Sequence, residues 1–263
     1  DGGGENSISA KVEDLKDTGY VTPKEMGQNM TANQIYESGK TIAGELTKIG
    51  INLNLAPVAD LASAQNPSYA MRCLGSDADG VADLLDDFVS SMREGGLSVT
   101  LKTFPGIGNV SADVTESIAE NTDSLMTIRD TNFVPYASGI QAGADCVMVS
   151  NAAYSKLTVK KVPAFMSQDI VTKLLREELG FDGIVMTSPL NDNVIENNYT
   201  NEFAVVEAVK AGCDLIVLPG NFKECYEALI TAVEEGRIDE KVINTSVRRI
   251  LQNKIQRGIL VLE

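Results

Sequence analysis

The sequence predicts an α/β fold with parallel strands, arranged either as a sheet covered by helices or as a barrel ringed by them. Apolar residues alternate along the chain between helical spacing and short continuous runs, which is typical of buried strands that alternate with helices. Four predicted strands run at their carboxyl ends into long polar or Gly/Pro-rich segments, the position at which parallel α/β folds hold their sites. The composition, 43% hydrophobic and 22% charged over 263 residues, is that of a globular protein.

The first helix is predicted at residues Asn33–Ile49, where apolar side chains recur at helical spacing until Gly50 stops them. The continuous apolar run Ile51–Val58 predicts a buried strand directly after it. The same order repeats four times, with helices at Val81–Glu94, Met126–Gln141, Gln168–Glu178 and Asn201–Lys210 and strands at Ser98–Thr103, Asp145–Ser150, Gly183–Thr187 and Asp214–Leu218. Two further helices, Lys223–Glu235 and Glu240–Gln256, follow, so the sequence predicts about five βα units.

Charge and histidine content exclude several classes of function. The chain has 37 acidic and 22 basic residues, and its net charge of −15 repels nucleic acid and anionic lipid. No apolar run reaches the ~18 residues that span a bilayer, so we expect no membrane insertion. The chain contains no histidine, which excludes Ser-His-Asp and Cys-His catalysis and histidine-ligated zinc. The four cysteines form no CxxC pair, and we expect neither a metal nor a cofactor.

Several motifs, in the same order along the chain, are similar to those of one enzyme family. They are Gly50–Asp60 (GINLNLAPVAD), Arg72–Asp77 (RCLGSD), Lys102–Asn109 (KTFPGIGN) and Leu174–Pro189 (LLREELGFDGIVMTSP). The sequence resembles the barrel domain of glycoside hydrolase family 3, in particular its bacterial β-N-acetylglucosaminidase branch. The resemblance implies a TIM (β/α)8-type barrel over residues 1–263 and a site for carbohydrate at the carboxyl ends of its strands.

The resemblance also assigns roles to individual residues. Ser188 stands where the family has the nucleophilic aspartate, and Thr115 stands where the Asp-x-His motif that begins at Asp113 has its acid/base histidine. Retaining hydrolysis needs an anionic nucleophile and a titrating acid/base, and two hydroxyl groups supply neither. The substrate-binding positions implied by the resemblance are Asp60, Arg72, Lys102 and Asn151.

The sequence therefore predicts a family 3 barrel with a decayed catalytic site, retained as a carbohydrate-binding or interaction module. An active β-N-acetylglucosaminidase that uses relocated carboxylates is the first alternative, with Asp192 and Glu116 as the candidates. A purely structural domain of a larger protein is the second. For Arg72 and Lys102, a structural ion pair with Asp60 or Asp113 is the alternative to sugar binding.

The beginning of the chain leads to a further expectation about the barrel. Asp1–Glu5 resembles the family turn that follows its third strand, so we expect the first three barrel strands to be missing from residues 1–263. About five parallel strands leave an open edge and an uncovered core. We expect an upstream segment or a partner chain to complete the barrel, or a rearranged packing to cover the gap.

Overall fold

A computed structural model describes residues 21–107 and 109–261, and the turn expected at Asp1–Glu5 lies outside these residues. The chain divides into two compact units. The first contains the described residues up to Asn109 together with Met126–Val147, and the second contains Val110–Leu125 together with the described residues from Met148 onward. Each unit combines parallel strands with helices, which confirms the predicted α/β class.

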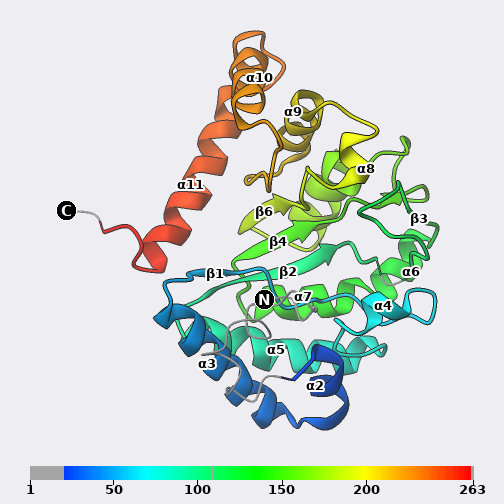
Figure 1. The fold of residues 1–263 in the computed structure, drawn as a ribbon, viewed down its shortest axis with the longest axis vertical. Helices are drawn as coiled ribbons and strands as arrows, with labels where there is room; N and C mark the ends of the chain where they lie inside the picture. Colours follow the sequence, from blue (N-terminus) through cyan, green and yellow to red (C-terminus); the bar gives the residue numbers. More distant parts are fainter. Residues whose placement is uncertain (1–20, 108, 262–263) are drawn as a thin grey trace. The chain divides into compact units, whose positions relative to one another are not determined.

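The first unit holds the first strands of the sheet and the helices packed against them. Its elements are α2 (Pro23–Asn29), α3 (Ala32–Lys48), β1 (Leu53–Asn54), α4 (Pro67–Ala70), α5 (Ala78–Glu94), β2 (Ser98–Phe104), α6 (Leu125–Asp130), α7 (Phe133–Gln141) and the start of β4 (Cys146–Val149). The strands hydrogen-bond in the order β1-β2-β4, with β1 parallel to β2. Figure 1 shows α3, α5 and α7 side by side along these strands.

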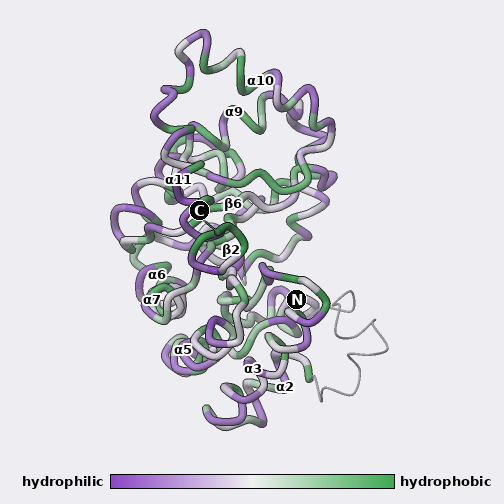
Figure 2. Tube along the Cα trace, turned by 90° about the vertical axis from the view of Figure 1, so that its left-hand side faces the viewer, coloured by the Kyte–Doolittle hydropathy of each residue, from purple (hydrophilic) through white to green (hydrophobic). Residues whose placement is uncertain are grey.

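The helices of this unit follow from their apolar faces and caps. The side chain of Thr31 accepts a hydrogen bond from the backbone N–H of Gln34, and the side chain of Gln34 accepts one from the backbone N–H of Thr31, which fixes the start of α3. Asp77 is the N-cap residue of α5, and its side chain accepts a hydrogen bond from the backbone N–H of Gly80. Figure 2 shows hydrophilic and hydrophobic residues alternating along that helix. Strand β2 is buried at six of its seven residues, as expected for a parallel strand under helices.

The second unit carries the later strands and the carboxyl-terminal helices. Its elements are β3 (Glu120–Asn121), the end of β4, β5 (Ala153–Tyr154), the 3-10 turn η2 (Ala164–Met166), the π-type helix η3 (Asp169–Glu178), β6 (Ile184–Thr187), α8 (Asn193–Glu196), α9 (Asn201–Ala211), α10 (Phe222–Glu234) and α11 (Glu240–Gln256). Strand β6 lies next to β4 in the sheet, and β3 pairs with β5 in parallel. Helices α9 and α10 pack around a small core of Val206, Val209, Ala232 and Ile238.

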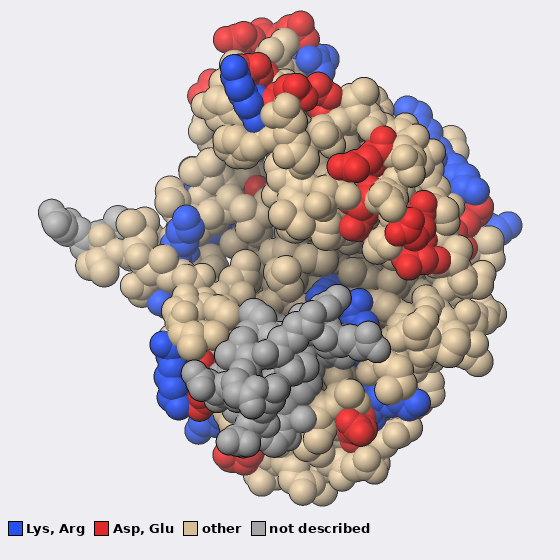
Figure 3. Space-filling view, viewed as in Figure 1, with Lys and Arg blue, Asp and Glu red and all other residues tan. Residues whose placement is uncertain are grey.

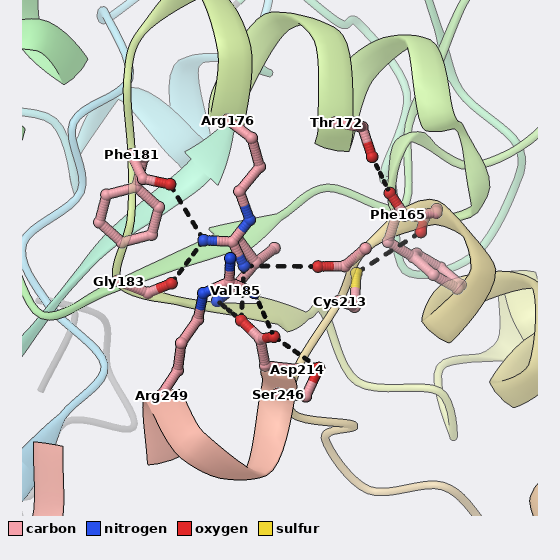
Figure 4. A network of polar contacts seen from close by, with 12 residues as sticks. Phe165, Thr172, Arg176, Phe181, Gly183, Val185, Cys213, Asp214, Ser246 and Arg249 are labelled. Carbon is pink, nitrogen blue, oxygen red and sulfur yellow. Dashed lines mark hydrogen bonds and ion pairs between the residues drawn. The ribbon is translucent and has the colours of Figure 1, made fainter. Parts of the chain in front are cut away.

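A buried polar network joins α11 to the strands of the second unit (Figure 4). The carboxylate of Asp214 contacts the guanidinium of Arg176 at 2.5 Å and that of Arg249 at 3.1 Å. It also accepts hydrogen bonds from the Ser246 hydroxyl and from the backbone N–H of Val185. Because Ser246 and Arg249 belong to α11, this one carboxylate connects the last helix to β6.

Three sequence-based predictions of elements are wrong in part. The strand expected at Ile51–Val58 is reduced to β1 and an isolated bridge from Val58 to Lys102, because Pro57 has no N–H to continue the ladder. The helix expected at Met126–Gln141 is two helices, α6 and α7, since Pro135 cannot donate to the preceding turn.

The strand expected at Asp214–Leu218 is the third predicted element that is wrong in part. Only Leu215 forms a bridge, to Met186, because the Asp214 carboxylate and the Thr187 hydroxyl take the backbone donors of Val185 and Val217. The described residues therefore form a sheet of four strands and no closed eight-stranded barrel. No helix among them is both long enough and apolar enough to cross a bilayer.

Surface charge in the second unit is uneven. Figure 3 shows acidic side chains gathered over α10, at the top of the view. This helix carries glutamates at 224, 227 and 234. Part of the net charge of −15 is therefore concentrated on this one helix.

Candidate functional site

Asp60 is the predicted binding residue of the first unit with the most hydrogen bonds to the surrounding protein. Its carboxylate is fully buried and accepts five hydrogen bonds. The hydroxyls of Tyr69 and Tyr136 donate at 2.7 and 2.9 Å. The backbone N–H and the hydroxyl of Thr103 donate at 3.1 and 3.0 Å, and the N–H of Ile107 donates at 3.3 Å. Burial raises the pKa of Asp60, and the hydrogen bonds from Tyr69, Thr103, Tyr136 and Ile107 oppose that rise.

Sequence reasoning missed both tyrosines. Tyr136 lies on α7, 76 positions from Asp60 along the chain, and no motif connects them. Together the five donors fix the loop that follows β1 against the end of β2. The structure thus places Asp60 where it orders the loop, and direct contact of its carboxylate with a sugar stays a prediction.

Lys102 and Arg72 lie in the same part of the first unit. Lys102 is the fifth residue of β2 and is 9% exposed. The pKa of its ammonium group is lowered to about 7, first by burial and then by the positive charge of Arg72, while the charge of Asp60 opposes the shift. The Arg72 guanidinium stacks over the Tyr69 ring at 5.3 Å from the ring centre. Within the described residues of this unit, Lys102 has no ion pair, so the structural alternative for this lysine finds no support there.

Asp113 and Thr115 lie together in the second unit. The Thr115 hydroxyl donates to Asp113 Oδ1 at 2.7 Å, and the Thr115 backbone N–H donates to the same oxygen at 2.9 Å. Thr115 also accepts, through its carbonyl, a hydrogen bond from the backbone N–H of Val194. The loop that carries the predicted acid/base position is therefore fixed to the start of α8.

Ser188 directly follows β6, at the carboxyl end expected for a nucleophile. It is 6% exposed, and its backbone N–H donates to the carbonyl of Val149 at 2.9 Å. Asn151, at the end of β4, is 1% exposed and donates through Nδ2 to Asp192 Oδ2 at 2.8 Å. The described residues of this unit give the Ser188 hydroxyl no carboxylate or amine as a hydrogen-bond partner.

Asp192 is the titratable group that stands out in the second unit. Burial, then the negative charge of Asp113, and more weakly that of Glu116, raise its pKa to about 6, while the hydrogen bond from Asn151 opposes the shift. Glu116 accepts a hydrogen bond from the Asn193 side chain at 2.8 Å. The structure thus brings both candidates for relocated carboxylates into one loop cluster with Asp113.

The described residues contain no group of three or more histidine, cysteine, aspartate or glutamate side chains that could hold a metal ion. All four cysteines are buried and free. Burial raises the pKa of the Cys73 and Cys213 thiols well above their usual range, so neither is a nucleophile at neutral pH.

Known proteins match this chain along most of its length. A beta-N-acetylglucosaminidase/beta-glucosidase of Cellulomonas fimi is 27% identical over 268 residues, covering 96% of this chain and 48% of the relative. A beta-hexosaminidase of Stenotrophomonas maltophilia is 32% identical over 219 residues, covering 83% of this chain and 62% of the relative. The chain spans about half the length of the first of these curated relatives.

Solved structures match as well. A glycoside hydrolase family 3 beta-N-acetylglucosaminidase from Paenibacillus sp. str. FPU-7 superposes with a TM-score of 0.87 at 32% identity, covering 92% of this chain and 48% of that one. A beta-N-acetylhexosaminidase from Beutenbergia cavernae superposes with a TM-score of 0.81 at 30% identity, covering 90% of this chain and 71% of that one. These similarities confirm the TIM-barrel type of the fold, with an incomplete barrel in the described residues.

Residues 9–253 match the family described as the glycosyl hydrolase family 3 N terminal domain. The matched region includes the strand-end residues Asp60, Lys102 and Ser188. The chain therefore belongs to glycoside hydrolase family 3.

Proposed function

We propose that this chain binds carbohydrate of the N-acetylglucosamine type and has lost the hydrolytic chemistry of its family. The names of its relatives supply the ligand class, because they include beta-N-acetylglucosaminidases and beta-hexosaminidases. The observation that carries the loss of chemistry is Ser188, a neutral hydroxyl at the carboxyl end of β6 in a chain without histidine. No imidazole exists to take its proton.

The acid/base position supports the same proposal. Retaining hydrolysis needs a group that gives a proton and then takes one, and a threonine hydroxyl does neither near neutral pH. The Thr115 hydroxyl donates to Asp113 instead. Loss of residues that act as a catalytic unit lowers kcat by about 10⁴-fold to 10⁶-fold.

An assay with a chromogenic N-acetyl-β-glucosaminide tests this part of the proposal. We expect turnover by the wild-type chain at the level of buffer, and the same for Ser188→Asp alone and Thr115→His alone. The double variant restores both roles, so weak turnover above that of either single variant is expected. Wild-type turnover well above buffer contradicts the proposed loss of chemistry.

Calorimetric titration with N-acetylglucosamine tests the binding part. A guanidinium group can donate several charge-assisted hydrogen bonds to sugar oxygens, so we expect Arg72→Ala to weaken binding by about tenfold or more. The exposed aspartate Asp182 offers a matched control, and Asp182→Asn should leave binding unchanged. If the wild-type chain binds no sugar, the chain is a purely structural domain and the binding proposal is wrong.

A second candidate function is hydrolysis by relocated carboxylates, and the pKa of Asp192 favours it. A carboxyl group that titrates near pH 6 is suited to general acid/base work at neutral pH, and Asn151 holds this one in place. Turnover that persists in Ser188→Ala but is abolished by Asp192→Asn or Glu116→Gln would support this function. Asp182→Asn is again the matched control for the loss of one negative charge.

A further inference from the structure

Leu218 has an unusual backbone conformation. Its φ angle is 44°, and among the residues that the structure describes it is the only one other than glycine with φ in the left-handed region. In this region the Cβ atom of an L-amino acid crowds the following carbonyl oxygen, so a leucine is strained there. Strained positions persist only where the surrounding structure holds them, and they are concentrated at functional sites.

Hydrogen bonds to the loop that carries Ser188 hold the backbone before Leu218. The backbone N–H of Val217 donates to the Thr187 hydroxyl at 3.1 Å, and the Val217 carbonyl accepts from the backbone N–H of Leu190 at 2.9 Å. Thr187 precedes Ser188, and Leu190 follows it by two residues. These bonds therefore place Leu218 beside the carboxyl end of β6, where Ser188 lies.

The side chain of Leu218 gains little from burial that could offset the strain. It is 58% exposed, although leucine is an apolar residue. A strained backbone that directs an apolar side chain into solvent has no evident benefit for folding. We therefore expect the benefit to come from contact with a ligand.

A second exposed apolar side chain follows after a short turn. Phe222, the first residue of α10, is 72% exposed, and its ring stacks on that of Tyr226 with the ring centres 6.2 Å apart and the planes at 16°. The Cys225 thiol donates to the carbonyl of Pro219 at 3.1 Å, which holds the turn against the first turn of α10. We call the side chains of Leu218 and Phe222 the apolar rim.

We propose that the apolar rim is a second sugar subsite, which packs against the face of a further ring in an oligosaccharide. This inference rests on the proposed carbohydrate function and names its ligand class as chains of two or more sugars. The C–H faces of a pyranose ring are apolar and pack against aromatic and aliphatic side chains. Residues 217–222 carry no charge, which suits a neutral ligand. Ser188 is nearly buried whereas the rim is exposed, so a ring at the rim lies further out than a ring beside Ser188.

Calorimetric titration with N-acetylglucosamine and with its β-1,4-linked disaccharide tests the inference. The two ligands share one ring, and only the disaccharide has a second ring that can reach the rim. We expect the wild-type chain to bind the disaccharide about fivefold more tightly, which corresponds to roughly 40 Å² of additional apolar surface removed from water. This ratio of the two affinities is the preference that the variants below should change.

Four variants assign the preference to the rim. Leu218→Asn has nearly the same size and tolerates the left-handed conformation, so the preference should fall to about twofold or less while the unfolding temperature stays at or above that of wild type. Leu218→Met keeps an apolar side chain on the same backbone, and the preference should remain. Phe222→Ala removes the exposed ring and should also lower the preference to about twofold or less. Val159→Asn, at an exposed valine in another loop of the second unit, is the matched control and should leave it unchanged.

Two results overturn the inference, namely equal affinity of the wild-type chain for the two sugars, and a preference that survives in Leu218→Asn or in Phe222→Ala. If the monosaccharide binds as well as the disaccharide, the proposed carbohydrate function stands and only the second subsite is wrong. If neither sugar binds, both proposals are wrong.

Discussion

At the scale of single residues, the pKa of Asp192 connects the candidate site to folding stability. Burial and the charges of Asp113 and Glu116 raise this pKa to about 6, so the folded chain holds the proton more tightly than the unfolded chain does. Between about pH 4 and pH 6 the native state binds more protons than the unfolded state, and the free energy of unfolding falls as the pH rises. Above pH 6 the contribution is constant, and the ionised carboxylate destabilises the fold.

Asp192→Asn should therefore stabilise the chain near neutral pH. Asparagine cannot ionise, and its side-chain oxygen can still accept the hydrogen bond from Asn151. After allowance for solvent screening of this half-buried group, we expect the gain over wild type to be about 1–2 kcal/mol larger at pH 7.5 than at pH 4. Urea unfolding at the two pH values measures it. Asp182→Asn corrects for the loss of one surface charge, and an Asp192→Asn gain that is equal at both pH values would contradict the pKa assignment.

The sequence located the candidate site residues at the ends of strands, but it did not predict their contacts. Asp60, Lys102 and Ser188 could be located because each follows or ends a recognisable strand motif. The donation from Tyr136 to Asp60 could not be predicted, since tertiary packing alone brings a helix residue to a loop 76 positions away. The pairing of Asn151 with Asp192 is of the same kind, and its hydrogen bond opposes the rise in the Asp192 pKa that burial causes.

At the scale of elements, a buried carboxylate helps to hold α11, whose Ile243 also packs against the core of the second unit. None of its residues is buried, and its polar contacts to the rest of the second unit include those of Ser246 and Arg249 with Asp214. Removal of one partner from a buried charge network leaves the others uncompensated, which is strongly destabilising. Asp214 also holds Arg176, so its loss affects the start of β6 as well.

Asp214→Asn should lower the free energy of unfolding by about 3 kcal/mol, because two arginines lose their counter-charge. Amide hydrogen exchange should accelerate across α11 in the same variant. The matched control is Asp169→Asn, which removes an exposed ion pair with Lys173 on η3 and should change stability by less than about 0.5 kcal/mol. Equal unfolding midpoints for the two variants, with unchanged exchange in α11, would show that the network does not hold the helix.

Helix positions were predicted better than strand extents, and the reason is physical. Apolar spacing reports which side chains are buried, and it located α3, α5, α9 and α11 to within a few residues. A strand also needs an unbroken ladder of backbone hydrogen bonds, which spacing does not report. Pro57 removes a donor from the first predicted strand, and the Asp214 side chain replaces ladder bonds in the last.

At the largest scale, the described residues combine a sheet of few strands with a helix that exposes apolar side chains. Four strands form the sheet of the described residues, whereas a closed barrel of this type needs eight. In the second unit, Val247, Leu251 and Ile255 form a stripe along α11 with exposures of 46%, 42% and 39%. Residues four apart on a helix share one face, so the stripe is continuous. Its cover by an upstream segment or a partner chain stays a prediction.

The chain of 263 residues should consequently bind the apolar dye anilinonaphthalene sulfonate, which reports exposed hydrophobic surface. Replacing the stripe by Val247→Gln, Leu251→Gln and Ile255→Gln together should lower the fluorescence gain by roughly half, because the stripe is one of several exposed apolar segments. Glutamine is a good helix former, and the replaced side chains are exposed, so far-UV circular dichroism and the unfolding midpoint should stay close to wild type. Val159→Gln is the matched control, because that valine is 99% exposed but isolated in a loop. Dye binding equal in the triple variant and in wild type would mean that the stripe is already covered within the chain, and the expected upstream segment or partner would then have no exposed face on α11 to bind.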